Sequence, residues 1–260
     1  MRHSLSLVLV LAIAAWASGV AAASAGDLLL PLAAGSAPDG TTYATRVWVT
    51  NTGVSTRSLS STFIAPGVDG TQAAANGSLS VLPGVTVLAA RLAPAGQSGM
   101  LLVSGAPQLL ITTRLEATAP DGALRAAAAG PVVSGHQLAA GRATLQLHGL
   151  SQKQVGLSTD LHVVNASRQA TKCAIDAFRF DGGRIASTVS ITLAPLSVRI
   201  FEKALVILGV ADIDEARFAV SCDQAFYTYA RVYKPGGGEL NVMTPSAPLG
   251  RGVTAAAARP

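Results

Sequence analysis

Short runs in which hydrophobic and polar residues alternate follow one another along most of this 260-residue chain. One example is the run at residues 46–50, Arg-Val-Trp-Val-Thr, which ends in the turn residues Asn51, Thr52 and Gly53. A period of two is typical of β-strands with one buried face, and Asn, Asp, Gly and Pro at the breaks are typical of turns. The pattern therefore predicts an all-β protein.

The expected strands fall into two series, and turn signals recur about every 8 to 12 residues. In the first series we expect strands at residues 46–50, 59–64, 79–82, 85–92, 101–103, 109–117 and 124–128. In the second series we expect strands at residues 160–164, 173–180, 185–193, 198–201, 218–221, 226–233 and 240–243. The segment at 203–216 is the one helical candidate of note. Many short strands with frequent turns favour antiparallel β-sandwiches.

The two series are related by an internal repeat. The segment at 43–53 returns at 157–167, so that Asn51 corresponds to Asn165, 114 positions later (165 − 51). This period exceeds the roughly 20 to 50 residues of solenoid repeats, so each copy is expected to be a domain with its own core. We therefore predict two tandem sandwich domains and a flexible tail, at residues 26–134, 141–245 and 246–260.

The first 25 residues have the features of a secretory signal peptide. Arg2 and His3 precede an apolar stretch at 5–16, and small residues at 21–25 offer a cleavage site. The apolar stretch is too short to span a bilayer comfortably, although a retained N-terminal anchor is the alternative. We expect an exported protein, periplasmic or extracellular, that is not an integral membrane protein.

Composition and charge narrow the class of partner. Half of the residues are hydrophobic, but 5% are aromatic and 13% charged, so the side chains suit thin sandwiches better than deep catalytic clefts. The net charge is +5; the first copy balances five arginines against five acids, and all four lysines lie in the second copy. Because the basic residues are scattered singly along the strands, we predict no nucleic-acid binding and, at most, weak attraction to an anionic cell envelope.

The segment from Val47 to Gly53, followed by a strand and an Asp-Gly turn, resembles the opening hairpin of bacterial immunoglobulin-like adhesion and scaffold modules of secreted proteins. The resemblance covers about a quarter of each copy. It implies immunoglobulin-like sandwiches and an extracellular interaction, and it supplies no catalytic residues. Two such domains after a signal peptide also resemble periplasmic pilus chaperones, but the long run of alternating hydrophobic residues in the first domain of those proteins is not found here.

Both cysteines, Cys173 and Cys222, lie in the second copy, and their counterparts in the first copy are Leu59 and Gly105. In an oxidising compartment, two cysteines on separate strands of one small sandwich are expected to form a disulfide. Closing a loop of about 50 residues stabilises by roughly 3 to 4 kcal/mol in the chain-entropy model. A redox pair is the alternative, but the pair lacks the CxxC spacing that lowers a thiol pKa.

Outward-facing aromatic residues are the main candidates for binding. In the strand at 226–233, Phe226 and its alternate neighbours align with the core face of the first copy. The opposite face then presents a row of Tyr227, Tyr229, Arg231 and Tyr233. Such a row suits stacking and hydrogen bonding with a sugar or a protein partner, and packing beneath a contact between the two domains is the alternative. Trp48 and His162 occupy corresponding outward positions and are further candidates, with the same alternative.

The sequence shows no recognised catalytic or metal-binding motif. His136, His148 and His162 are each isolated, although His148 and His162 could approach one another near Asp160 on adjacent strands. The carboxylates at 212–215 are more typical of a solvated cap than of an acid/base pair. We predict no catalytic residues, no metal and no cofactor.

Taken together, these features predict a non-catalytic adhesion, assembly or ligand-binding protein whose partner is an envelope protein or a polysaccharide. A secreted carbohydrate-active enzyme, or its carbohydrate-binding accessory, is the alternative. A periplasmic pilus-type chaperone ranks below both.

Overall fold

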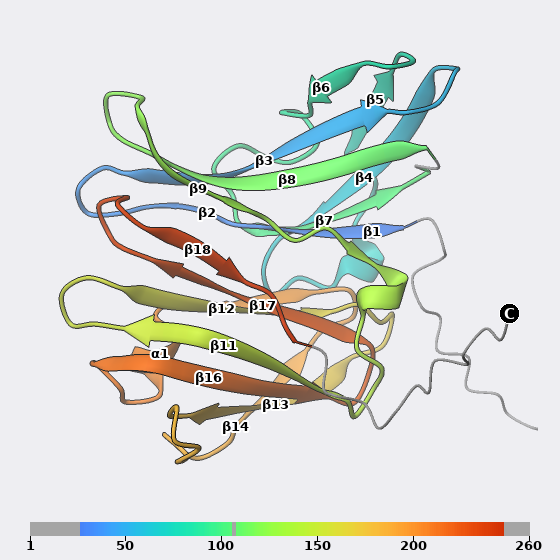
Figure 1. Ribbon diagram of the computed structural model, residues 1–260. Helices are drawn as coiled ribbons and strands as arrows, with labels where there is room; N and C mark the ends of the chain where they lie inside the picture. Colours follow the sequence, from blue (N-terminus) through green and yellow to red (C-terminus); the bar gives the residue numbers. More distant parts are fainter. Residues whose placement is uncertain (1–26, 106–107, 247–260) are drawn as a thin grey trace, which may run out of the picture.

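The computed structural model describes residues 27–105 and 108–246, and antiparallel β-strands make up most of it (Figure 1). The predicted all-β class is confirmed. The predicted signal peptide and the predicted tail beyond Ser246 lie outside the described residues. Ser246 itself donates a backbone hydrogen bond of 3.0 Å to the carbonyl of Gln146. In the described residues, no helix has the length and apolar character needed to cross a membrane.

The first half of the chain forms β1 (Leu28–Leu32), β2 (Ala34–Ser36), β3 (Thr42–Asn51), β4 (Arg57–Ile64), β5 (Gly77–Val81), β6 (Thr86–Leu88), β7 (Gly99–Ser104), β8 (Leu109–Thr118), β9 (Leu124–Ala129) and β10 (Val133–Ser134). The second half forms β11 (Thr144–Gln152), β12 (Ser158–Asn165), β13 (Thr171–Phe178), β14 (Val189–Leu193), β15 (Val198–Phe201), β16 (Ile213–Cys222), β17 (Phe226–Tyr233) and β18 (Leu240–Met243). The short helices are η1 (Gly70–Gln72), η2 (Gly135–Gln137) and α1 (Ala204–Ile207).

The prediction of a helix at residues 203–216 is wrong for most of this segment. Only one turn, α1, is helical, and the chain is already extended in β16 from Ile213. Gly209 has a φ of 81°, a left-handed conformation that ends the helix. Asp212 lies beyond this turn, whose N-cap residue is Lys203, and its carboxylate accepts a hydrogen bond of 2.9 Å from the Lys153 ammonium group.

The strands form four sheets, which we call A to D. Sheet A has the order β10-β1-β7-β4-β5, and sheet B has the order β2-β3-β8-β9 with β6 also paired to β3. Sheet C has the order β15-β12-β17-β18, and sheet D has the order β11-β16-β13-β14. Strands β1-β7-β4-β5 of sheet A therefore match sheet D, and β6-β3-β8-β9 of sheet B match sheet C. The repeat in the sequence is also a repeat of strand order.

Each half has its own hydrophobic cluster between its two sheets. Sheets A and B enclose one cluster, which includes Leu30, Val49 and Leu101, while sheets C and D enclose another around Leu161 and Phe218. These residues alternate along their strands with residues that face away from the cluster, as the period of two requires.

The two copies also share a buried asparagine at the same place in the strand order. Asn51 and Asn165 both have an exposed fraction of 0%. In each case the side-chain amide donates to two backbone carbonyls, and the side-chain oxygen accepts from the backbone N–H two residues later. The partners are Ser55 O, Val81 O and Gly53 N for Asn51, and Gln169 O, Ala194 O and Ser167 N for Asn165, at 2.7 to 3.0 Å. The turn after β3 and the turn after β12 are therefore fixed by the same interaction.

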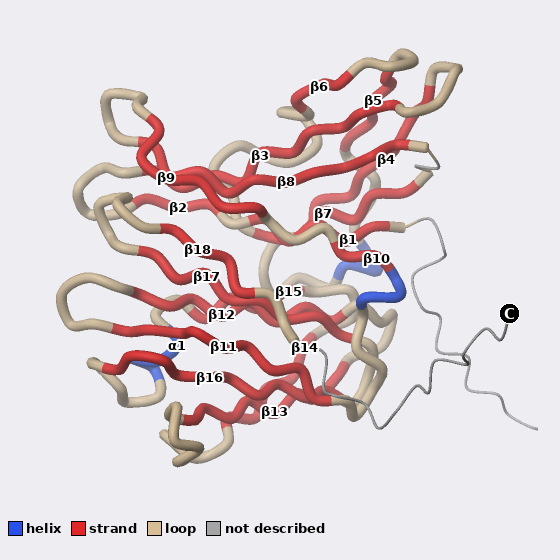
Figure 2. The backbone as a smooth tube through the Cα atoms, in the orientation of Figure 1, coloured by secondary structure: helices blue, strands red, loops and turns tan. Residues whose placement is uncertain are grey.

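Sheet C lies between sheet D and the first half of the chain, so both of its faces are covered (Figure 2). Every residue of β12 is buried. The outward face of sheet A packs on one part of sheet C through residues such as Leu29, Ile64 and Met100. The ends of β3 and β8 cover another part through residues such as Tyr43 and Leu115.

Backbone contacts fix the junction between the halves. Gly67 N donates to Val198 O and Gly70 N donates to Pro195 O, each at 2.9 Å. A Cβ atom on Gly70 would lie 2.3 Å from the carbonyl oxygen of Leu196, far closer than van der Waals contact. A glycine is therefore needed at this point of close approach.

Candidate functional site

The row of aromatic residues predicted on the outward face of β17 is covered by the first half of the chain. Tyr227 is 6% exposed, Tyr229 2% and Arg231 7%, and Tyr233 is partly buried. The prediction that this row is exposed is wrong, and the alternative, packing beneath a contact between the two halves, is what the structure shows. The alternation along β17 correctly places these side chains on the face away from the core of the second half, but sheet A and the end of sheet B pack on that face.

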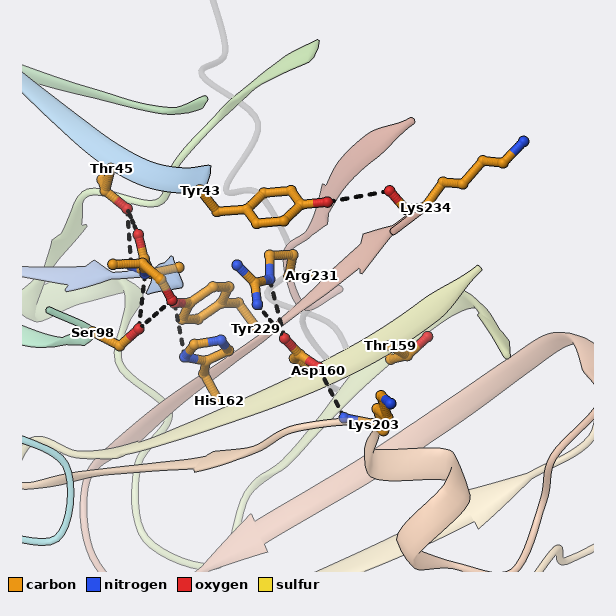
Figure 3. A network of polar contacts seen from close by, with 12 residues as sticks. Tyr43, Thr45, Ser98, Thr159, Asp160, His162, Lys203, Tyr229, Arg231 and Lys234 are labelled. Atoms are coloured by element: carbon orange, nitrogen blue, oxygen red, sulfur yellow. Dashed lines mark hydrogen bonds and ion pairs between the residues drawn. The ribbon is translucent and has the colours of Figure 1, made fainter. Parts of the chain in front are cut away.

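An ion pair is buried at this junction (Figure 3). Asp160 of β12 lies directly opposite Arg231 of β17 in the sheet register. The guanidinium donates to Oδ2 of Asp160 through Nε at 3.1 Å and also through Nη2. Oδ1 of Asp160 accepts a hydrogen bond of 2.9 Å from the backbone N–H of Lys203. Both carboxylate oxygens are thus bonded.

Two tyrosines enclose the guanidinium of Arg231. Its Cζ atom lies 5.2 Å from the ring centre of Tyr43 and 4.5 Å from that of Tyr233. Both distances are within the range of cation–π attraction. The hydroxyl of Tyr43 donates to the carbonyl of Lys234 at 3.2 Å, so Tyr43, from the first half, is bonded to the second.

Burial would by itself lower the pKa of Arg231, but the charge of Asp160 and its hydrogen bonds more than offset this, so the pKa is raised. Among the described residues, Nη1 of Arg231 has no hydrogen-bond partner. A buried ion pair is costly to desolvate and contributes little net stability, whereas removal of one partner leaves an uncompensated charge. Both partners belong to sheet C, and the contact of the first half with the pair is the ring of Tyr43 over the guanidinium.

His162 stacks on Tyr229 in the same layer. The two residues are opposite one another in β12 and β17, with ring centres 4.3 Å apart and an angle of 22° between the rings. The Tyr229 hydroxyl and Nδ1 of His162 are 2.9 Å apart and share a hydrogen bond. Burial, with a further contribution from the charge of Arg231, lowers the pKa of His162 well below its usual value. The ring is therefore neutral at neutral pH.

The other histidines do not approach His162. His148 is exposed on β11 in sheet D, and His136 lies in η2, where its ring nitrogens are 3.1 and 3.2 Å from Oγ of Ser134. The possible convergence of His148, His162 and Asp160 is therefore not observed. In the described part of the chain, no group of three or more His, Cys, Asp or Glu side chains is placed to hold a metal ion.

Trp48 lies apart from this network, on the outward face of sheet B. Its position is opposite Thr112 of β8 and Leu88 of β6. The ring is partly exposed, and the guanidinium of Arg114 lies 5.1 Å from its centre. We call the surrounding surface the Trp48 face, and its residues are Arg46, Trp48, Leu88, Leu110, Arg114 and Glu116.

The Trp48 face combines apolar and basic groups. Leu88 is 48% exposed and Leu110 is 56% exposed. Glu116 bonds both arginines: Oε2 lies 3.3 Å from Nε of Arg46, and Oε1 accepts at 2.8 Å from Nε of Arg114. Two arginines sharing one carboxylate leave this surface with a net positive charge.

The Trp48 face is the counterpart of the buried face of sheet C. The pairing of Arg46 with Arg114 in sheet B corresponds to that of Asp160 with Arg231 in sheet C. His162 likewise takes the place of Trp48. The same face of the repeated sheet is thus covered in the second half and open in the first.

The predicted disulfide between Cys173 and Cys222 is present, and the two residues are opposite one another in β13 and β16. Their S–S distance is 2.06 Å. In the first half, Ser60 of β4 lies opposite Ser104 of β7. The next pair of positions in this register is Leu59 and Gly105, which correspond to the two cysteines. The disulfide therefore joins strands that already pair in both halves.

Comparison with known proteins does not assign a family. No family model and no curated protein matches the chain. Among the solved structures that match is one described as the crystal structure of Thermotoga maritima 1070, with a TM-score of 0.34 and 10% identity. The match covers 42% of this chain and 96% of the other. A likeness at this level carries no inference about function, so the site must be interpreted from its own geometry.

Proposed function

We propose that this chain is an exported, non-catalytic protein of the cell envelope or the extracellular space, which acts in adhesion or assembly. Its two halves would be immunoglobulin-like sandwich units, joined rigidly by the buried face of sheet C. The Trp48 face would bind the partner. The observation that carries this proposal is that the counterpart of the Trp48 face is already a packing surface for a β-sheet within the same chain.

The chemistry of the Trp48 face supports a protein partner. Tryptophan and arginine are enriched among the residues that contribute most to protein–protein binding, and exposed leucines supply apolar area beside them. On sheet C, the corresponding surface is covered by apolar side chains of sheet A. By analogy, the partner would present an apolar sheet face with at least one carboxylate, because Arg46 and Arg114 share a single acidic residue.

The alternatives receive less support from the geometry. A carbohydrate-active enzyme would need polar groups gathered around one cleft, whereas His148 and His162 lie on different sheets and Asp160 is bonded to Arg231. A chaperone of the pilus type would need a distinctive strand motif that the sequence lacks. The tyrosine row, which was the main candidate for sugar binding, is buried.

The test is co-sedimentation of the mature protein with envelope fractions of the cells that produce it. Trp48→Ala is expected to weaken binding at least about tenfold, equivalent to about 1.4 kcal/mol, and to change the melting temperature by no more than about 3 °C. Phe180→Ala is the matched control, because Phe180 is an aromatic residue 83% exposed on a turn of the second half. Equal binding by wild type and Trp48→Ala would rule out the Trp48 face.

A further inference from the structure

The outward face of sheet D carries a depression of about 630 Å³ above the disulfide. Side chains that line it alternate with Cys173 and Cys222, which face the core of the second half. Lys172 of β13 lies opposite Thr192 of β14, and Thr144 of β11 lies opposite Ser221 of β16. All four strands of the sheet thus contribute polar side chains to one surface.

Two basic groups and one carboxylate flank these hydroxyls. Arg142, Lys172 and Asp223 are exposed, and all three line the depression. Within the ranges that the structure describes, none of their charged groups has an ion-pair or hydrogen-bond partner. By contrast, Lys153 in the same half contacts both Asp212 and Asp214. The charges around the depression are therefore available to a ligand.

Arg142 is held in an unfavourable backbone conformation at the rim. Its φ is 68°, in the left-handed region that favours glycine. Its backbone N–H donates to the carbonyl of Cys222 at 2.7 Å. The preceding Gly141 lies so close to β16 that a Cβ atom there would be 2.3 Å from the carbonyl oxygen of Asp223. The hydrogen bond to Cys222 and the close packing of Gly141 on β16 hold Arg142 in this conformation.

The corresponding strands of the first half carry serine hydroxyls where the depression has Lys172, Thr192 and Ser221. Ser58 takes the place of Lys172, Ser80 that of Thr192, and Ser104 that of Ser221. The hydroxyls of Ser58 and Ser80 bond one another at 2.7 Å, so these groups satisfy each other. At these positions the second half therefore differs from the first by the Lys172 cation and by the disulfide.

We propose that this depression binds an acidic saccharide, meaning a segment of polysaccharide whose sugars carry carboxylates. Arg142 and Lys172 would contact a carboxylate, while Asp223 and the hydroxyls would exchange hydrogen bonds with sugar hydroxyls. A free phosphate suits the site less well, because Asp223 repels a compact anion and the remaining hydroxyls would be unused. This proposal does not depend on the Trp48 face, which lies on sheet B.

Titration calorimetry of the mature protein at low salt tests the proposal with three probes: an oligouronate, a neutral oligosaccharide of the same length, and inorganic phosphate. The oligouronate is expected to bind at least about tenfold more tightly than either of the others. Lys172→Ser, which installs the residue of the first half, and Arg142→Gly should each weaken oligouronate binding about fivefold or more. Arg179→Ser removes an exposed positive charge outside the depression and should leave binding unchanged.

Loss of structure cannot produce this result, because Arg142→Gly places glycine at a positive φ and is expected to melt at the same temperature or higher. Phosphate binding as tight as oligouronate binding would show a simple anion site and overturn the proposal. The same holds if the oligouronate does not bind, or if Lys172→Ser and Arg142→Gly bind it as wild type does. None of these outcomes bears on Trp48→Ala in co-sedimentation, so the two proposals fail separately.

Discussion

At the scale of single residues, the junction between the halves contains charged and aromatic side chains that are largely buried. Asp160 and Arg231 neutralise each other, and Tyr43 and Tyr233 shield the guanidinium from water. Tyr43 and Asp160 were not among the predicted site residues. The sequence does place an acidic residue, Asp160, and a basic residue, Arg231, on two predicted strands. Only the pairing register of β12 with β17 shows that the two side chains lie opposite one another.

We expect Arg231→Met to destabilise the protein strongly, because it leaves the Asp160 carboxylate buried without its cation. The expected cost is about 3 to 5 kcal/mol, which corresponds to a fall of roughly 6 to 20 °C in melting temperature. The double variant Asp160→Asn, Arg231→Met removes both charges and keeps an acceptor for Lys203 N, so it should regain much of that loss. Thermal melts of the single and double variants measure both effects. If the double variant is no more stable than Arg231→Met, the ion pair does not explain the loss.

A second residue-scale prediction concerns acid stability. The folded state keeps His162 neutral, since its pKa is well below 6.5, while the unfolded state protonates it near pH 6.5. Between these values the unfolded state binds more protons, so stability falls as the pH drops below about 6.5, by up to about 1.4 kcal/mol per pH unit from this group.

Denaturant unfolding at several pH values between about 4 and 7 tests this expectation. His162→Gln should reduce the dependence of the unfolding free energy on pH relative to wild type. His148→Gln, at an exposed histidine, is the control and should keep the wild-type dependence. An unchanged slope in His162→Gln would exclude this residue as the source.

At the scale of elements, alternation and turn residues predict most strands, and the repeat anticipates the matching strand order of the two halves. The same information does not show what covers a strand. In β17, alternation separates Tyr229 from the core of its own half, but only the packing of the halves shows that sheet A buries it. The continuous burial of β12 is typical of a strand with both faces covered. Its run Leu161-His162-Val163-Val164 carries part of that signal.

The disulfide is the element-scale contact that the sequence predicts best, since two cysteines on neighbouring strands leave one pairing. Reduction should lower the melting temperature by several degrees, because the bridge closes a loop spanning 49 positions. The double variant Cys173→Ala, Cys222→Ala is the control and should melt at the same temperature with and without reductant. Mass spectrometry of the unreduced protein should find the two peptides linked. Freely alkylated thiols in the native protein would contradict the bridge.

At the scale of the whole molecule, two halves with one strand order use the same sheet face differently. In the second half, this face holds His162, Asp160 and Tyr229 against the first half. In the first half, it holds Trp48 and stays open. We expect the partner to bind the open face, whereas the buried face keeps the halves in place.

Tryptophan fluorescence tests this claim most directly, since Trp48 is the one tryptophan after the predicted signal peptide. In the free mature protein, acrylamide should quench the emission readily, because the ring is partly exposed. Saturating binding to the envelope fraction should shift the emission to shorter wavelength and reduce the quenching, as the ring loses contact with water. Emission and quenching that stay unchanged when binding is complete would contradict the account.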